Sequence, residues 1–151
     1  MNKSILWCGL GGVAIVALLV SGSFLSGGGN LATVNLSNRE VAMVCTTDMA
    51  TKFHIHLNLK IFVKGEEHVI PASIGVRSGC MNPLHTHTPD GIIHIESPEA
   101  RDFALGDFFA VWNKNFMEFG PSVQMTVNGG VVTELENYPM KDGDKIELRY
   151  E

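Results

Sequence analysis

The chain has 151 residues, which is enough for one compact domain beside a short N-terminal segment. Apolar residues make up 45% and charged residues 18%, a composition that excludes an intrinsically disordered chain and a coiled coil. The 11 Lys and Arg against 16 Asp and Glu give a net charge of −5. Because the cations are not clustered, we expect no nucleic-acid partner.

Residues 5–25 are apolar and uncharged, and about 20 such residues can cross a bilayer as a helix. Lys3 precedes them, in agreement with the positive-inside rule. The alternative is a cleaved signal peptide, with small residues at 21–23 near a cleavage site. We expect a retained anchor, because the run exceeds the usual signal core of roughly 7–15 residues. Both alternatives place the remaining chain on the extracytoplasmic side.

The expected domain organisation has three parts. Residues 1–26 form a transmembrane anchor or signal peptide, residues 27–37 a flexible Gly-rich linker, and residues 38–151 an extracytoplasmic metal-binding domain. The membrane, through the N-terminal helix, is thus one expected partner, and a membrane protein complex is another candidate.

The strongest strand signal is at residues 53–63, where apolar residues occupy every second position. His54 and His56 therefore share the opposite face. Residues 64–67 predict a turn and residues 68–70 a return strand. Residues 77–91 read as a loop, and residues 92–96 as a short strand.

The one predicted helix covers residues 103–112, where Leu105, Phe108, Phe109 and Trp112 form a single apolar stripe. Strands follow at residues 122–127 and 145–150, with a hairpin signal at Asn128-Gly129. Strands followed by a helix and further strands predict an α+β fold with one helix packed on the sheet.

Four segments resemble the β-grasp fold of ubiquitin-like and sulfur-carrier proteins: the hairpin at 53–71, the helix start at 105–109, and residues 127–129 and 141–146. The resemblance implies a β-grasp-like mixed sheet with one packed helix. Sulfur carriers end in Gly-Gly, whereas this chain ends in Tyr150-Glu151. The resemblance therefore implies the fold alone, and a fold does not assign a function.

A second resemblance covers residues 43–115. The segments at 54–57, 70–75, 84–87, 91–97 and 105–112, with Cys80, are similar to a family of small exported archaeal and bacterial proteins. The motif of that family is His-Thr-His-Asp followed by Gly-x-Ile-His-x-Glu. The likeness implies a shared site without naming a reaction. This chain has Thr88 in place of the Asp, and Asp90 is a candidate substitute.

Two His-x-His pairs and a further histidine are candidate metal ligands: His54, His56, His85, His87 and His94. On an extended backbone, residues i and i+2 point the same way, roughly 6–7 Å apart, which suits two imidazoles on one ion. A single His-x-His pair more commonly lies on a solvated surface without a ligand. Two pairs and a fifth histidine together favour a metal site. His68, beside two glutamates in the predicted turn, is expected to be an ordinary surface residue.

Imidazole ligands leave the metal open among Zn, Cu, Ni and Fe. Cu(II) leads the divalent affinity order, and the thioethers of Met43, Met49 and Met81 would suit Cu(I). We therefore expect copper, with zinc as the alternative.

Cys8 lies in the apolar run, so Cys45 and Cys80 are the only thiols of the expected exported part. An oxidising compartment favours a disulfide between them, which would stabilise the fold by roughly 3–4 kcal/mol. The alternative is that one or both thiolates bind the metal.

An enzyme is the weaker expectation. Asp90, Glu96 and Asp107 lie near the histidines in sequence and could orient ligands or act as bases. Asp90 and Glu96 are the expected second-shell residues. The sequence thus predicts a membrane-tethered protein that binds or delivers copper, or a metal-bearing accessory subunit. The alternatives are a small zinc-dependent hydrolase and a structural interaction module.

Overall fold

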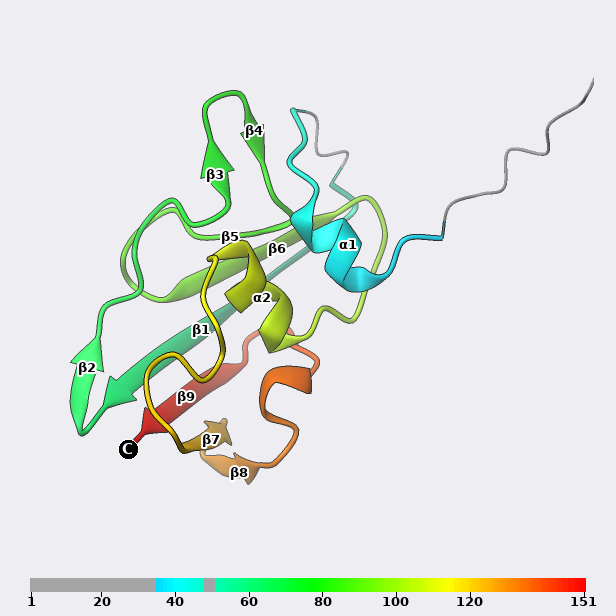
Figure 1. Cartoon of the computed structure of the whole chain (residues 1–151). Coiled ribbons are helices and arrows are strands. Elements are labelled where there is room, and N and C mark those ends of the chain that lie inside the picture. Colours follow the sequence, from blue (N-terminus) through cyan, green and yellow to red (C-terminus); the bar gives the residue numbers. More distant parts are fainter. Residues whose placement is uncertain (1–34, 48–50) are drawn as a thin grey trace, which may run out of the picture. The chain divides into compact units, whose positions relative to one another are not determined.

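The computed structural model describes residues 35–47 and 51–151, and Figure 1 shows how their elements are arranged. These residues belong to one compact unit, Val34–Glu151. The expected membrane segment at 5–25, with its signal-peptide alternative, lies outside the described residues, as does most of the expected linker. Within the described part, no helix is both long and apolar enough to cross a membrane.

The elements follow one another along the chain in this order: α1 (Asn38–Met43), β1 (Phe53–Val63), β2 (Glu66–His68), β3 (Val76–Arg77), β4 (Cys80–Met81), β5 (Leu84–His85), β6 (Ile92–Ser97), α2 (Leu105–Val111), β7 (Val123–Val127), β8 (Gly130–Val132), the 3-10 helix η1 (Leu135–Asn137) and β9 (Lys145–Tyr150).

The main sheet has the order β5-β6-β1-β9-β7-β8, with β2 also paired to β1. β1 and β9 run parallel, and every other pair of the described strands is antiparallel. β6 pairs with residues 53–58 of β1, and β2 pairs with residues 61–63 on the same edge. The predicted α+β class, with a mixed sheet and a packed helix, is confirmed.

The hydrophobic core lies between the sheet and α2. The alternation predicted for residues 53–63 places Leu57, Leu59 and Ile61 in this core. Phe108 and Phe109 of α2 are buried against the same core. Burial of each such side chain contributes about 1.5–3 kcal/mol, so the apolar alternation of β1 accounts for which face of the sheet α2 covers.

The helix α1 was not predicted from the sequence. Its start is a capping box, in which the Glu40 main-chain N–H donates to Ser37 Oγ and the Ser37 main-chain N–H donates to Glu40 Oε2. α1 packs against α2, with Ala42 fully buried. Arg39 Nε lies 2.7 Å from Asp107 Oδ1, and Asp107 Oδ2 accepts the Ala104 N–H at the start of α2. Asp107 therefore links the two helices on the core side of the sheet.

Two local predictions were wrong in detail. The first turn is the two-residue step Lys64-Gly65, both with positive φ, so the return strand begins at Glu66 rather than at residue 68. The predicted loop at 77–91 contains β4 and β5 and part of β3, each only two residues long. Such short strands carry no detectable periodicity, because one alternation needs more residues than they have.

The predicted disulfide is confirmed: Cys45 and Cys80 are bonded, with their Cα atoms 5.4 Å apart. The bridge ties the segment after α1 to β4, and the main chains of Thr46 and Met81 pair beside it. The thiolates that the alternative would have used as metal ligands are therefore consumed in the bond.

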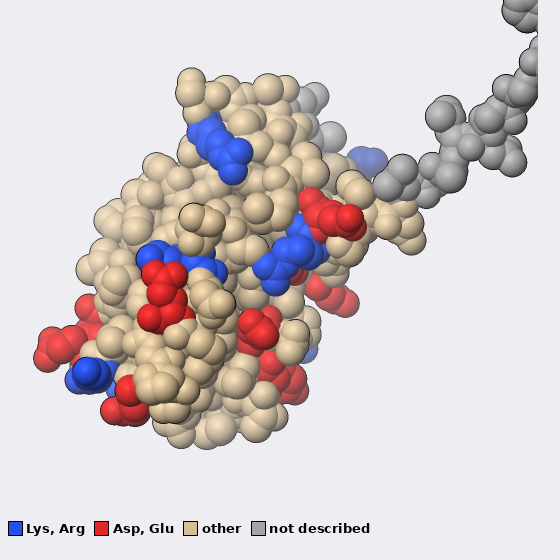
Figure 2. Space-filling model, viewed as in Figure 1, with Lys and Arg blue, Asp and Glu red and all other residues tan. Residues whose placement is uncertain are grey.

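On the face seen in Figure 2, acidic and basic side chains are intermixed.

Candidate metal centre

Five histidines gather on the face of the sheet opposite α2. His54 and His56 occupy positions of β1 that alternate with apolar residues buried in the core or packed against it. His56 lies directly opposite His94 of β6, and His94 lies opposite His85 of β5. Directly opposed residues share a face of the sheet, so three imidazoles form a row across three strands. His87, two residues beyond His85, completes the cluster.

His94 is at the centre of this cluster. Its ring centroid lies 4.5 Å from that of His56, 6.0 Å from that of His54, 5.2 Å from that of His85 and 4.6 Å from that of His87. Two triads each bring their candidate ligand atoms within 4.8 Å of one another: His54-His56-His94 and His85-His87-His94. Among the described residues, the five are thus arranged as two triads sharing His94, rather than as one set around one point.

These separations are close to those needed for a common metal ion. With metal–nitrogen bonds of about 2 Å, tetrahedral ligand atoms lie roughly 3.3 Å apart. Small side-chain rotations would therefore bring either triad to an ion. Each triad leaves a fourth coordination position for water, a substrate or another ligand.

His85 is fully buried, and its ring is fixed in one tautomer. Its Nδ1 lies 3.0 Å from the main-chain oxygen of Asn82. A carbonyl oxygen can only accept, so the proton is on Nδ1 and the lone pair is on Nε2. That Nε2 is buried and has no hydrogen-bond partner in the described part of the chain. Metal-binding histidines typically have this arrangement, with the second nitrogen donating to a carbonyl or carboxylate.

Burial also keeps the His85 imidazole neutral. It lowers the pKa of His85 from 6.5 to about 4, while the hydrogen bond to Asn82 opposes the shift. The pKa of His94 is lowered as well, first by burial and then by the neighbouring His56 and His87. Neutral imidazole is the form that binds a metal, so both rings are in the ligand form at pH 7.

The His-Thr-His segment is held by the threonine in its middle. Thr86 N–H donates to the Ile74 main-chain oxygen, and its own main-chain oxygen accepts from Ser73 N–H. Thr86 Oγ1 donates to the Pro71 oxygen and accepts the N–H of Ile74. Four hydrogen bonds from one buried residue therefore fix the backbone between His85 and His87.

A glycine makes this attachment possible. Gly75 has a φ of +71°, and a Cβ at this position would lie 2.5 Å from the Leu84 main-chain oxygen. Only glycine allows the 71–75 segment to approach β5 so closely.

Glu96 of β6 contacts the cluster directly. It pairs with His54 across the strands, and its Oε1 lies 3.1 Å from His54 Nε2. Its other oxygen accepts from the Thr51 hydroxyl at 3.5 Å. The carboxylate can therefore orient the His54 ring, as expected of a residue behind a ligand.

Asp90 is engaged elsewhere. Its carboxylate accepts from the Thr88 hydroxyl and from the Ile92 N–H, and these bonds, the Ile92 bond first, lower its pKa. Asp90 thus closes the turn between His87 and β6. The triads that the structure brings together do not include it.

The remaining candidates lie apart from the triads. His68 is exposed in β2, with its ring 4.7 Å from that of Phe119. Met43 ends α1 and Met81 lies in β4, whereas Met49 is outside the described residues. Asp107 is on α2, on the core side of the sheet.

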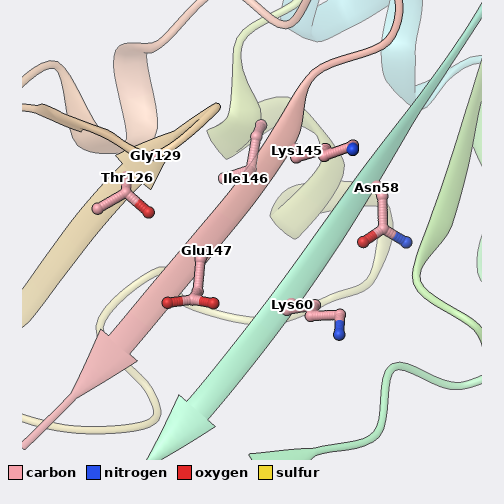
Figure 3. Close-up of a pocket in the computed structure, with 7 residues that line it drawn as sticks. All are labelled: Asn58, Lys60, Thr126, Gly129, Lys145, Ile146 and Glu147. Atoms are coloured by element: carbon pink, nitrogen blue, oxygen red, sulfur yellow. The ribbon is translucent and has the colours of Figure 1, made fainter.

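A groove leads away from the cluster over the open face of the sheet. A hollow of about 160 Å³ is lined by His56, Asn58 and Lys145, among others. A larger hollow of about 510 Å³ adjoins it, and Asn58 and Lys145 line both. Figure 3 shows Asn58 and Lys60 extending from β1 and Lys145 and Glu147 from β9. The histidine cluster is therefore accessible from the side of His56.

Sequence reasoning did not identify Thr86, Asn82 or Gly75 as parts of the site. The only available signal was that Thr86 lies between two candidate ligands. The carbonyl of Asn82 cannot be recognised from residue type, because every residue has one.

Comparison with protein-family models, curated proteins and solved structures finds no match to this chain. The function is therefore inferred from the chemistry of the site itself.

Proposed function

We propose that this domain binds a transition-metal ion through His54, His56, His85, His87 and His94, and that it binds or delivers copper on the extracytoplasmic side of a membrane. The observation that carries the proposal is His85: a neutral, fully buried imidazole whose lone-pair nitrogen is unpartnered and directed into a histidine cluster. A buried polar atom without a partner costs about 1–3 kcal/mol, and a metal ion would remove that cost.

Copper is the proposed metal, with zinc as the alternative. The candidate ligands are all imidazoles, and Cu(II) binds nitrogen sites most tightly among the divalent first-row metals. Because Cys45 and Cys80 are in a disulfide, thiolate ligands that would favour Cu(I) do not compete.

The proposed location is a membrane surface facing an oxidising compartment. The disulfide supports such a compartment. Residues 5–25 support a membrane anchor through their length and apolar composition. A protein held at the membrane could pass an ion to a membrane protein complex, which is the proposed partner.

We also propose that the fold is a β-grasp derivative. The parallel β1–β9 pair at the centre, the hairpins on either side and the helix on one face support this assignment. In this proposal, β3 to β6 form an insertion that adds three of the five histidines. The His-Thr-His and Gly-x-Ile-His-x-Glu segments support membership of the exported family with that motif.

A small zinc-dependent hydrolase is the second candidate. It is favoured by the groove beside His56 and by Lys60 and Lys145, which make no ion pair with any residue the structure describes. A three-histidine zinc ion with an open position generates hydroxide near neutral pH, and the two ammonium groups would attract an anionic substrate. A structural interaction module, in which the histidines are incidental, is the third alternative.

Metal analysis of the purified full-length chain tests the proposal. After exposure to Cu(II) or Zn(II) and removal of excess ion, mass spectrometry should find bound metal, and calorimetry should find tight binding at pH 7. Affinity should fall on acidification, since protonated imidazole does not bind, and His85 should stop contributing once the pH falls to its pKa of about 4.

The matched comparison is His85→Ala against His68→Ala. The first should lose most of the affinity, whereas the second should bind as the unaltered chain does, because His68 lies outside both triads. Equal binding by the two variants, or no bound metal at all, would overturn the proposal and leave the interaction module. Hydrolysis of anionic esters only by the zinc-loaded chain would favour the second candidate.

A further inference from the structure

The two histidine triads have one residue in common, and that residue is His94. The other four members form two separate pairs, one from β1 and one from β5 and the residues after it. β6 lies between these strands, and neighbouring strands are about 4.8 Å apart, so the backbones of β1 and β5 are separated by roughly 10 Å. Either triad is complete without the pair of the other.

Both ring nitrogens of His94 are free for ligands. Nδ1 is buried without a partner, and no hydrogen bond joins either nitrogen to a described residue. His85 differs in this respect, because its Nδ1 is bound to the Asn82 oxygen and only Nε2 is available. The Nδ1 and Nε2 lone pairs of an imidazole ring point to different sides, so one ring can contact two ions once both nitrogens are deprotonated.

The neighbours of His94 come from the strands on either side of β6 and from the residues after β5. His56 stands edge-on to it, with an interplanar angle of 82°, and His87 stands edge-on at 73°. His85 is stacked on it at 12°. No other histidine of the cluster has neighbours from both pairs, so a bridging role falls to His94 alone.

We propose that His94 bridges two metal ions as an imidazolate, one ion held with His54 and His56 and the other with His85 and His87. This inference rests on the proposed metal-binding function and adds a second ion to it. The first ion takes the lone pair of neutral His94. The second ion replaces the remaining N–H proton, which is released to water, so one additional proton leaves for each bridge formed.

The two positions would differ in character. The ion beside His85 would lie in the buried part, with a backbone fixed by Thr86, and would dissociate slowly. The ion beside His54 and His56 would lie at exposed side chains next to the groove, with Glu96 contributing negative charge, and would be the one open to exchange or to substrate. The imidazolate charge would reduce the repulsion between the ions, which would lie roughly 6 Å apart given metal–nitrogen bonds of about 2 Å.

The test is titration of the full-length chain with Cu(II), followed by electron paramagnetic resonance. We expect two equivalents to bind, with loss of most of the integrated Cu(II) signal at low temperature, because the imidazolate couples the two unpaired spins. One equivalent would overturn the bridge and leave the metal-binding proposal intact. Two equivalents with undiminished signal would also overturn it, and no binding would overturn both.

Variants separate the two positions. The double change His54→Ala with His56→Ala, and the single change His87→Ala, should each bind one equivalent with a full, uncoupled signal. His68→Ala, outside both triads, should retain two coupled ions. Circular dichroism of each variant establishes that it is folded. Coupled spins in either triad variant would contradict the assignment of ligands.

Discussion

Thr86 and Ile74 are joined by two hydrogen bonds. The Thr86 N–H donates to the Ile74 oxygen at 3.1 Å, and the Ile74 N–H donates to Thr86 Oγ1 at 3.1 Å. Thr86 is fully buried, so this pair locks the chain between His85 and His87 to the preceding segment. The geometry of two candidate ligands therefore depends on a residue that binds no metal.

The change Thr86→Val should weaken both the fold and the site. Valine keeps the shape of threonine but removes the hydroxyl, which leaves the buried Ile74 N–H without that acceptor and the Pro71 oxygen without that donor. We expect a loss of about 1–3 kcal/mol in the free energy of unfolding and about 10–100-fold in metal affinity. Urea denaturation and calorimetry measure the two effects.

The matched control is Thr88→Val, two residues away. Thr88 is exposed and, among the described residues, its hydroxyl donates to the Asp90 carboxylate alone, so its loss should change the free energy of unfolding by less than about 0.5 kcal/mol. If the two variants behave alike, the proposed lock is unimportant.

The metal-free protein should lose stability between pH 6.5 and pH 4. The pKa of His85 is about 4 in the folded chain and near 6.5 when unfolded, so the unfolded state binds more protons in this range. Stability should therefore rise with pH across the window and level off above it. His85 alone would account for a change of roughly 2–4 kcal/mol in the free energy of unfolding across this window. Urea denaturation in the presence of a chelator measures it.

His85→Leu provides the comparison, because leucine does not titrate. Its stability profile should be shallower over the same window, with the remaining slope due to His94, whose pKa is lowered too. Asp90 affects stability only at lower pH. Its pKa in the folded chain lies below 3.8, so its contribution to the free energy of unfolding is lost only in more acidic solution. Parallel profiles for the variant and the unaltered chain would show that His85 titrates normally.

The disulfide predicts a fixed thiol count. In the denatured but unreduced full-length chain, only Cys8 should react with a thiol reagent, since Cys45 and Cys80 are bonded. Mass spectrometry of the labelled chain checks this. Cys45→Ser should lower the free energy of unfolding by about 2–5 kcal/mol. Three labelled cysteines in freshly prepared protein would contradict the bridge.

Residues 5–25 predict that the mature protein stays with membranes after a carbonate wash. Fractionation followed by immunoblotting measures this. A mature N-terminus beginning near Ser23 or Gly27, found by N-terminal sequencing, would identify a cleaved signal peptide instead.

The parts of the fold with repeated local patterns were predictable. The alternation in β1 gives both its core face and the shared face of His54 and His56. Asn128-Gly129, both with positive φ, forms the expected hairpin turn. α1 could also have been predicted, because Ser37 and Glu40 have the spacing of a capping box.

The parts that depend on register between distant segments were not predictable. Asp90 and Glu96 looked alike in sequence, but only the pairing of β6 with β1 places Glu96 beside His54. The same register puts His94 between the two histidine pairs. Sequence spacing shows which residues share a strand face, but it does not show which strand lies next to which.

β2 and β6 share one edge of β1, and β5 lies beyond β6, so the histidine-bearing strands β5 and β6 form one end of the main sheet. Residues 58–63 of β1 pair with β9, and the last three of them also pair with β2, whereas residues 53–58 pair with β6, which in turn pairs with the two-residue β5. Two register pairs join β5 to β6, and the buried Leu84 and the hydrogen bonds of Thr86 also hold this edge strand in place. An ion bound to histidines of β1, β6 and β5 would add a reversible link between these three strands. Because such an ion binds the folded form, raising the metal concentration would strengthen this end of the sheet.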